Sequence, residues 1–343
     1  MLGAFAGDFV GSRFEFFPIK SRDFELVSEI CRPTDDTILT IAVGDALVTG
    51  RDMGETLRMF AQSFPTSYGM HFREWFNGRL GSYEPYGSWG NGAAMRVSTT
   101  AWLATSFAEC MELAEKSAAV THNHPEGIRG ARAVAAAIYA GLSGWHRDDI
   151  KPFIERAFGY DLSRNLDDVM LESRFELKSD ISVPKALMCA FNAETVEDAI
   201  RNAVYLGGDC DTEGAIAGSI AETWSHVPED VMEAFWRHIP GPLRKRIRAI
   251  QDKMAATVRT PLTREEADAV VAWDPKVVEE WDAAIKAAEE EANAEEIAAR
   301  KVEINRLNAE ADSRDGIIRH EKDRSEPKGI QAKCLMLIQR FFG

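Results

Sequence analysis

The sequence has few of the features that would tie the protein to a membrane or to an oxidising compartment. Its five cysteines, an odd number, are scattered at positions 31, 110, 189, 210 and 334, without a disulfide framework or the paired spacing of a cysteine metal site. No apolar stretch approaches the roughly 20 residues that a membrane-spanning helix needs. Because the first motif directly follows Met1 and Leu2, we expect no signal peptide and a cytoplasmic location.

Positive charge and β-strand patterns are also scarce. Lys and Arg number 40 against 55 Asp and Glu, and the formal net charge of -15 at pH 7 disfavours unspecific binding to nucleic acid or to an anionic membrane. We find neither alternating β-branched runs nor an internal repeat. Apolar residues instead recur at helical spacing, for example in the segments 101–119, 130–145, 196–204 and 228–238. The pattern predicts an all-α fold.

Two short acidic runs carry most of the chemical information. Asp35 and Asp36 stand in the run 34–37, and Asp209 and Asp211 stand in the run 207–212. Each run precedes an apolar helical pattern, so its carboxylates belong to a first turn, where the helix dipole favours negative charge. If folding brings the runs together, their oxygens form a cage suited to Mg²⁺ or Mn²⁺. The alternative is helix capping, because Asp and Thr side chains accept bonds from the free N–H groups of a helix start.

The opening segment places Gly3, Gly7 and Gly11 four residues apart on one helical face, with Glu15 four residues later. Small residues at this spacing allow two helices to approach closely. The corresponding membrane motif is disfavoured, because charged residues interrupt a stretch that is too short to span a bilayer. Helix packing is the alternative role for the glycines, and a solvated position is the alternative for Glu15.

Two further segments indicate substrate contacts. Residues 87–96 are rich in glycine and are typical of a backbone nest for an anionic group, although they lack the lysine and hydroxyl of a phosphate-binding loop. An ordinary turn is the alternative. His122 and His124 precede an alanine-rich helical pattern and lack a third zinc ligand at a metal-like spacing. We expect them to form hydrogen bonds with substrate or backbone.

Five motifs in one order resemble the ADP-ribosylglycohydrolase family, which includes the dinitrogenase reductase-activating glycohydrolase. In chain order they are Gly7-Asp8-x-x-Gly11-x-x-x-Glu15, Thr34-Asp35-Asp36-Thr37, Gly90-Asn91-Gly92-x-Ala94-Met95-Arg96, Thr121-His122 and Gly207-Gly208-Asp209-x-Asp211-Thr212. The sequence departs from the family pattern at Ser98-Thr99, at Glu213 and at Glu222. Of these, Glu213 lies beside the expected centre and leaves the substrate preference open.

The resemblance implies a compact orthogonal helical bundle with a centre of two Mg²⁺ or Mn²⁺ ions. The implied metal ligands and near-ligands are Glu15, Thr34, Asp35, Asp36, Asp209, Asp211 and Thr212. The implied substrate-binding residues are Gly90, Asn91, Gly92, Ala93, Ala94, Met95, Arg96 and His122. The loop 90–96 is expected to hold the diphosphate and distal ribose.

We therefore expect a metal-dependent hydrolase that releases ADP-ribose from a modified protein side chain or a small molecule. Asp35 or Asp36 is expected to position the attacking water or take its proton, and Glu15 to act near the leaving group. Nucleic acid is expected only as a modified substrate. Two alternatives are a catalytically inactive member that binds ADP-ribose or has a structural role, and another two-metal phosphoesterase. The phosphoesterase is disfavoured because such sites usually also use histidine ligands.

The composition changes near Thr257, and we expect a catalytic domain over residues 1–257 and a charged helical extension over residues 258–343. Within the extension, Val278, Trp281, Ile285 and Ala288 form the narrow stripe of an amphipathic helix. A charged linker is expected over 312–328, followed by a short apolar segment over 330–342. The extension is the candidate site for a protein partner or for docking on the catalytic domain.

Overall fold

The computed structural model describes residues 1–312, so the expected linker from residue 313 onward and the apolar segment 330–342 lie outside the described residues. Within residues 1–312 the regular elements are α-helices and no strand is formed. The predicted all-α fold is confirmed. The helices are α1 (Leu2–Gly11), α2 (Asp35–Thr49), α3 (Met53–Ser63), α4 (Met70–Phe76), α5 (Gly92–Met95), α6 (Ser98–Leu103), α7 (Phe107–Ala119), α8 (Pro125–Leu142), α9 (Arg147–Phe158), α10 (Leu166–Glu172), α11 (Ser179–Phe191), α12 (Val196–Leu206), α13 (Cys210–Ala221), α14 (Glu229–His238), α15 (Gly241–Ala256), α16 (Arg264–Asp268) and α17 (Lys276–Asp312).

The chain divides into two compact units. The first comprises Met1–Asn77 and Pro85–Asp274, and the second comprises Gly78–Glu84 and the residues from Pro275 onward, of which α17 is described. The expected domain border at residue 257 stays a prediction. None of the described helices is both long enough and apolar enough to cross a bilayer.

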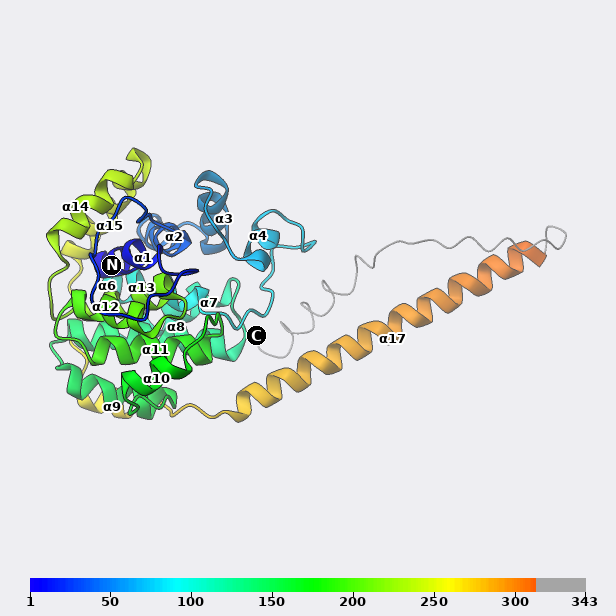
Figure 1. The fold of residues 1–343 in the computed structure, drawn as a ribbon. Coiled ribbons are helices and arrows are strands. Elements are labelled where there is room, and N and C mark those ends of the chain that lie inside the picture. The colour runs from blue at the N-terminus through cyan, green and yellow to red at the C-terminus, as the bar shows by residue number, and fades with distance from the viewer. Residues whose placement is uncertain (313–343) are drawn as a thin grey trace. The chain divides into compact units, whose positions relative to one another are not determined.

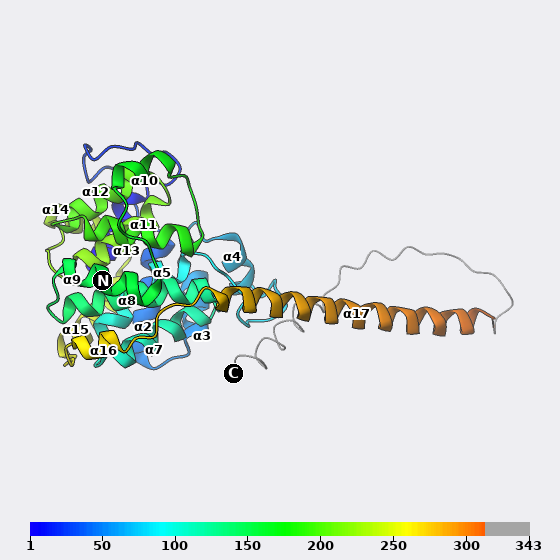
Figure 2. The same ribbon diagram turned by 90° about the horizontal axis from the view of Figure 1, so that it is seen from below.

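Helices α1 and α13 form the closest helix contact of the first unit. A β-carbon added to Gly7 would lie 2.0 Å from the carbonyl oxygen of Gly214, and one added to Gly3 would lie 2.1 Å from that of Gly218. Only glycine fits at these positions, so the expected close approach through the glycine stripe is confirmed. Helices α8, α11 and α13 lie side by side in the same unit (Figures 1 and 2).

Side chains at the helix ends explain two differences from the sequence pattern. Glu222, which follows α13, accepts hydrogen bonds from the backbone N–H of Leu2 (3.1 Å) and of Gly3 (2.9 Å) and so caps the start of α1. The expected unbroken helix over 101–119 is wrong. Ala104 adopts an extended conformation after α6, and Ser106 caps α7 by accepting from the N–H of Glu109.

The segment that precedes α11 is held against the Gly-rich loop, which we define as Gly87–Arg96. The N–H of Asn91 donates to the carbonyl of Leu177 (2.8 Å), and the N–H of Ser179 donates to that of Trp89 (2.9 Å). These bonds fix one wall of the functional site.

Candidate active site

The structure brings carboxylates of the two acidic runs together at the starts of α2 and α13. One oxygen each from Asp8, Asp36 and Asp211 lies within 4.8 Å of the others, and the same holds for Glu15, Asp209 and Asp211. We call these five residues together with Asp35 the acid cluster. Asp211 belongs to both groups of three. Asp35 belongs to neither, but it lines the same cavity.

Asp8 is the member of the acid cluster that the sequence reasoning did not assign to the site. It is fully buried on α1, and its Oδ1 accepts from the hydroxyl of Thr34 (2.7 Å). Its Oδ2 accepts from the N–H of Thr34 (2.9 Å) and from both the N–H (3.1 Å) and the hydroxyl of Thr37. A carboxylate between two glycines of an otherwise apolar helix was the available signal, because burial of an ion is costly unless it is paired or bonded.

One hydroxyl of each acidic run lies beside Asp36. Thr34 Oγ1 lies 3.3 Å from Asp36 Oδ2, and Thr212 Oγ1 donates to the same oxygen at 3.3 Å. Thr34 also caps α2, as the capping alternative expected, by accepting from the N–H of Asp36. The other oxygen of Asp36, Oδ1, is buried and has no hydrogen-bond partner. Desolvation of a carboxylate oxygen without a partner is costly, and this oxygen is available to a ligand.

Burial and mutual repulsion dominate the electrostatics of the acid cluster. The pKa values of Asp35, Asp36 and Asp211 are raised well above the usual value, first by burial and then by neighbouring carboxylates. Burial likewise raises the pKa of Asp209 to about 7 and that of Glu15 to about 8, the latter also through the charge of Asp211. A cation reverses both effects, because it favours the charged form of each carboxylate.

The donor set of the acid cluster fits a hard divalent cation. It offers carboxylate and hydroxyl oxygens, an unpartnered oxygen on Asp36, and neither imidazole nor thiolate. Cys210, although it stands between Asp209 and Asp211, is buried in an apolar cluster with Phe14 and Val204. It therefore packs in the core and is not a metal ligand candidate.

The Gly-rich loop is joined to the acid cluster by Asn91. The amide nitrogen of its side chain donates to Asp209 Oδ2 at 2.7 Å and to the hydroxyl of Ser182 at 3.1 Å. Ala93, Ala94 and Met95 form the short helix α5 and are buried, so they support the loop from behind. The three glycines of the loop, 87, 90 and 92, all line the cavity.

His122 contacts this loop through a chain of buried polar groups. The fully buried Arg96 donates from Nη2 to the carbonyl of Ser117 (2.9 Å) and to Thr121 Oγ1 (2.8 Å). Thr121 Oγ1 in turn lies 2.7 Å from His122 Nδ1. Because a guanidinium only donates, the hydroxyl proton of Thr121 is free for Nδ1, and this favours the His122 tautomer that carries its proton on Nε2.

That Nε2 faces the Gly-rich loop. A β-carbon added to Gly92 would lie 3.0 Å from it, so the ring occupies the space beside this glycine. Burial, and secondarily the charge of Arg96, lower the pKa of His122 well below its usual value, and the ring is therefore neutral. His124 instead accepts from the N–H of Glu126 and caps α8, which places it in a backbone contact.

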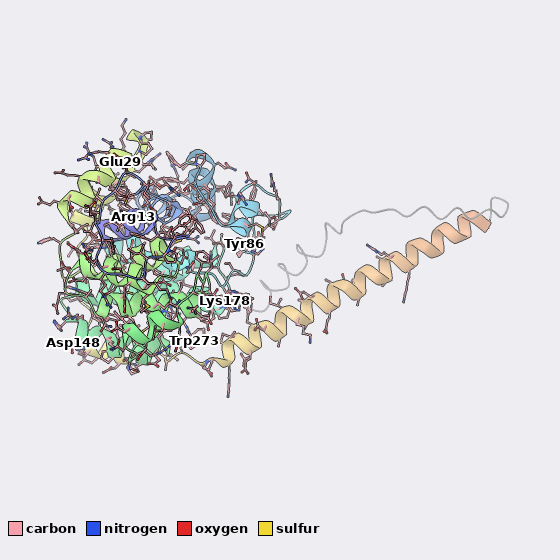
Figure 3. The ribbon with its side chains drawn as sticks, viewed as in Figure 1. Arg13, Glu29, Tyr86, Asp148, Lys178 and Trp273 are labelled. Atoms are coloured by element: carbon pink, nitrogen blue, oxygen red, sulfur yellow. The ribbon has the colours of Figure 1, made fainter. Side chains whose placement is uncertain are left out.

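A cavity of about 680 Å³ connects the acid cluster to the Gly-rich loop and His122. Sequence reasoning missed its other walls, which include Tyr86, Trp89, Phe175, Leu177 and Lys178. Tyr86 and Lys178 lie on the same side of the first unit (Figure 3). The volume is in the range of sites that hold a nucleotide-sized ligand. Except for Trp89, which stands in the glycine motif, nothing in the sequence pattern singles out these residues.

The fold and site together define an all-α enzyme with an oxygen-only cluster at one end of its cavity and a Gly-rich loop at the other. Residues 1–261 match the sequence pattern of the ADP-ribosylglycohydrolase family. The chain belongs to this family, and the predicted assignment to glycohydrolase enzymes is confirmed.

Relatives and solved structures agree with this assignment. The chain is 25% identical over 286 residues to ADP-ribosylarginine hydrolase Tri1 of Pseudomonas putida (strain GB-1), covering 70% of this chain and 74% of that protein. It is 27% identical over 264 residues to ADP-ribosylhydrolase ARH3 of Mus musculus, covering 57% and 71%. A solved structure titled ADP-ribosylglycohydrolase-related protein complex matches with a TM-score of 0.53 and 20% identity, over 75% of this chain and 93% of that one. This last likeness shows the fold alone.

Proposed function

We propose that the protein hydrolyses the glycosidic bond at the anomeric carbon of an ADP-ribosyl group in a metal-dependent reaction and releases ADP-ribose from a protein side chain or a small molecule. The observation that carries the proposal is the single cavity that joins the acid cluster to the Gly-rich loop. Its two ends are separately suited to the two parts of the substrate, an anionic diphosphate and a sugar carbon that water attacks.

The loop end of the cavity would hold the diphosphate. The glycines at 90 and 92 leave backbone accessible to phosphate oxygens. His122 Nε2–H adds a neutral donor at the same place, held in position by Thr121 and Arg96. Trp89 is half exposed at the rim and offers an aromatic face for stacking with a base. The anomeric carbon would then lie at the acid cluster.

The acid cluster would hold two divalent cations, Mg²⁺ or Mn²⁺, because two groups of three carboxylates share Asp211. The residues that would hold them are Glu15, Thr34, Asp35, Asp36, Asp209, Asp211 and Thr212, with Asp8 as the member added by the geometry. When bound, such ions supply neutralising charge and lower the pKa of water.

Asp36 and Asp35 are the candidates for positioning the attacking water. Asp36 offers the buried Oδ1 that has no partner, and Asp35 is half buried at the wall of the cavity. A carboxylate within hydrogen-bond reach of the water would orient it and take its proton. Glu15, half buried at the rim of the cavity, is the candidate for the leaving-group side.

The test is incubation with ADP-ribosylated arginine, serine, acidic-residue and nucleic-acid substrates, with Mg²⁺, with Mn²⁺ or with EDTA, followed by mass spectrometry. We expect free ADP-ribose from at least one substrate, loss in EDTA and recovery with one of the two ions. Release of AMP would instead identify a phosphoesterase. Binding of ADP-ribose without turnover of any substrate would identify an inactive family member.

A further inference from the structure

A second hollow of about 430 Å³ adjoins the main cavity. Its walls are Glu15, Phe16, Pro18, Lys20, Ser173, Arg174, Phe175, Gly207 and Gly208. It shares Glu15, Phe16 and Phe175 with the main cavity, whereas no residue of the Gly-rich loop lines it. A leaving group that passes Glu15 on its way out of the acid cluster therefore enters this hollow. It does not pass the Gly-rich loop, where the diphosphate is expected.

Two aromatic rings mark the border between the hollows. Phe16 is 62% exposed and Phe175 is 46% exposed, and their ring centroids are 5.9 Å apart. Exposed rings at the edge of a cavity are suited to cover the apolar part of a bound peptide. They give the second hollow a wall that a larger substrate would contact.

Lys20 and Arg174 give this hollow its charge. Lys20 Nζ donates to the carbonyls of Met170 (2.8 Å) and Ser173 (3.1 Å), which leaves one of its three protons for a ligand. Arg174 is exposed and uses only Nη1 for the carbonyls of Leu171 and Ser173. Among the side chains that the structure describes, neither Lys20 nor Arg174 forms an ion pair with a carboxylate.

The acidic side chains near these cations are already engaged, apart from Glu15. Glu172 pairs with Arg164, and Glu176 accepts from the N–H groups of Leu177 and Lys178. Below the wall, the buried Glu213 lies 3.8 Å from Lys185 Nζ, which also donates to the hydroxyl of Ser173. Glu213 therefore lies behind Gly208, with Lys185 as its cationic neighbour, and does not itself line the hollow.

The backbone of Lys20 adopts an unusual conformation. Its φ angle of 48° makes it the one residue other than glycine, among those described, in the left-handed region. Such a conformation is strained for a side-chain-bearing residue and persists where the surroundings enforce it. The pKa of Lys20 is lowered by burial and then by the charges of Arg174 and Lys185, so the cations of this wall repel one another.

We propose that this hollow is an acceptor subsite in which Lys20 and Arg174 bind an acidic side chain next to the ADP-ribosylated residue of a peptide. The inference rests on the proposed function. It implies that peptides with an acidic residue next to the ADP-ribosylated residue are preferred. Peptides with a cationic residue at that place are repelled. A peptide is favoured over nucleic acid as the acceptor, because the net charge of -15 opposes a polyanion at longer range.

The test uses three peptides that carry the same ADP-ribosylated residue, the one cleaved best in the substrate panel, flanked by Asp, Asn or Lys. We expect kcat/KM for the Asp peptide to exceed that for the Asn peptide about 3-fold at low salt, since an ion pair at a partly exposed site contributes only modestly to binding. The ratio should fall as salt is added. It should approach 1 in Arg174→Gln, and Arg174→Glu should favour the Lys peptide.

The matched control is Arg237→Met. Arg237 is an exposed arginine of α14 that does not line either hollow, and this variant should keep the wild-type ratio. Equal turnover of all three peptides, a preference for Lys in the wild type, or a stronger preference for an ADP-ribosylated oligonucleotide would overturn the inference.

A binding measurement separates this inference from the proposed function. Calorimetry with unmodified Asp and Asn peptides does not depend on turnover. Tighter binding of the Asp peptide to wild type than to Arg174→Gln, with no ADP-ribose released from any substrate, would refute the proposed function and support the anion-binding hollow. Equal binding of the two peptides by wild type, together with normal turnover, would overturn the hollow alone.

Discussion

The two ends of the main cavity differ in the charge and the hydrogen bonding of their buried groups. At the acid cluster, buried carboxylates repel one another, and Asp36 Oδ1 has no partner within the protein. At the loop end, Arg96 Nη2, Thr121 and His122 form a continuous hydrogen-bonded chain, although Arg96 Nε and Nη1 are also buried without a partner. The two ends therefore differ in the sign of their buried charge: the loop end buries one guanidinium, and the acid cluster buries several carboxylates whose charged form a cation would stabilise.

We expect the largest effect on activity from the loss of the Asp211 carboxylate, which both groups of three share. Asp211→Asn should abolish ADP-ribose release, because Asp211 belongs to both groups of three, while circular dichroism should show near wild-type helix content. In EDTA, at a pH high enough to ionise the acid cluster, the variant should melt at a higher temperature than wild type, because one member of a repelling set has lost its charge. In excess Mg²⁺ the wild type should instead melt at a higher temperature than the variant.

The control is Asp230→Asn, at the exposed start of α14, which should change neither turnover nor the response to Mg²⁺. Full activity of Asp211→Asn would show that the acid cluster does not hold the catalytic metal.

After removal of the metal, the free energy of unfolding should fall as the pH rises. The folded-state pKa values of Asp209, about 7, and Glu15, about 8, exceed the unfolded values of about 4. Raised carboxyl pKa values mean that the folded state binds more protons, so stability is retained below about pH 4 and is lost as pH rises through pH 8. Thermal melts in EDTA should show this fall, and saturating Mg²⁺ should flatten it. Identical profiles with and without the ion would contradict the comparison.

At the loop end, Gly92→Val should weaken ADP-ribose binding by about 10-fold or more and leave Mg²⁺ binding unchanged. The added side chain would meet His122 Nε2, since the β-carbon alone lies 3.0 Å away. Calorimetry with ADP-ribose and with Mg²⁺ distinguishes the two effects. Gly241→Val, at a glycine with open space around it, is the matched control. If Gly92→Val bound ADP-ribose normally, the loop would be only a turn.

A smaller effect is expected from the hydroxyl that connects Arg96 to His122. Thr121→Val should leave His122 Nδ1 without a partner and Arg96 Nη2 with only its bond to the Ser117 carbonyl, and so weaken ADP-ribose binding several-fold, whereas Thr121→Ser should restore most of the affinity. Nitrogen NMR of His122 should show the Nε2–H tautomer in wild type and in Thr121→Ser and a mixture in Thr121→Val. An unchanged tautomer in Thr121→Val would show that the hydroxyl does not set it.

The parts of this site that could be predicted from sequence are those in which local pattern and chemistry coincide. The acidic runs met as expected, because each precedes a helix and the glycine stripe of α1 brings α13 close. Asp8 was missed because its role depends on Thr34 and Thr37, which reach it only in the folded chain. The wall around Leu177 could not be predicted, since backbone bonds to the Gly-rich loop place it and leave no side-chain pattern.

The smallest effect on the active site is expected from shortening the chain at its C-terminal side. Residues 259–273 belong to the first unit and are bonded to its helices: Trp145 donates to the carbonyl of Leu262 at 3.0 Å, and the N–H of Trp273 donates to that of Ala157 at 3.0 Å. A chain ending at Asp274 should therefore keep its melting temperature and its turnover of a small ADP-ribosylated substrate. A chain ending at Thr260 loses the buried Leu262 and should be destabilised by about 2 kcal/mol or more.

The role of α17 is tested with the chain ending at Asp274, by comparing turnover per folded molecule for the small substrate and for a modified protein. Loss on the protein substrate alone would mark the extension as a recognition arm, whereas equal loss on both substrates in the chain ending at Asp274 would show that the extension shapes the active site, contrary to our expectation.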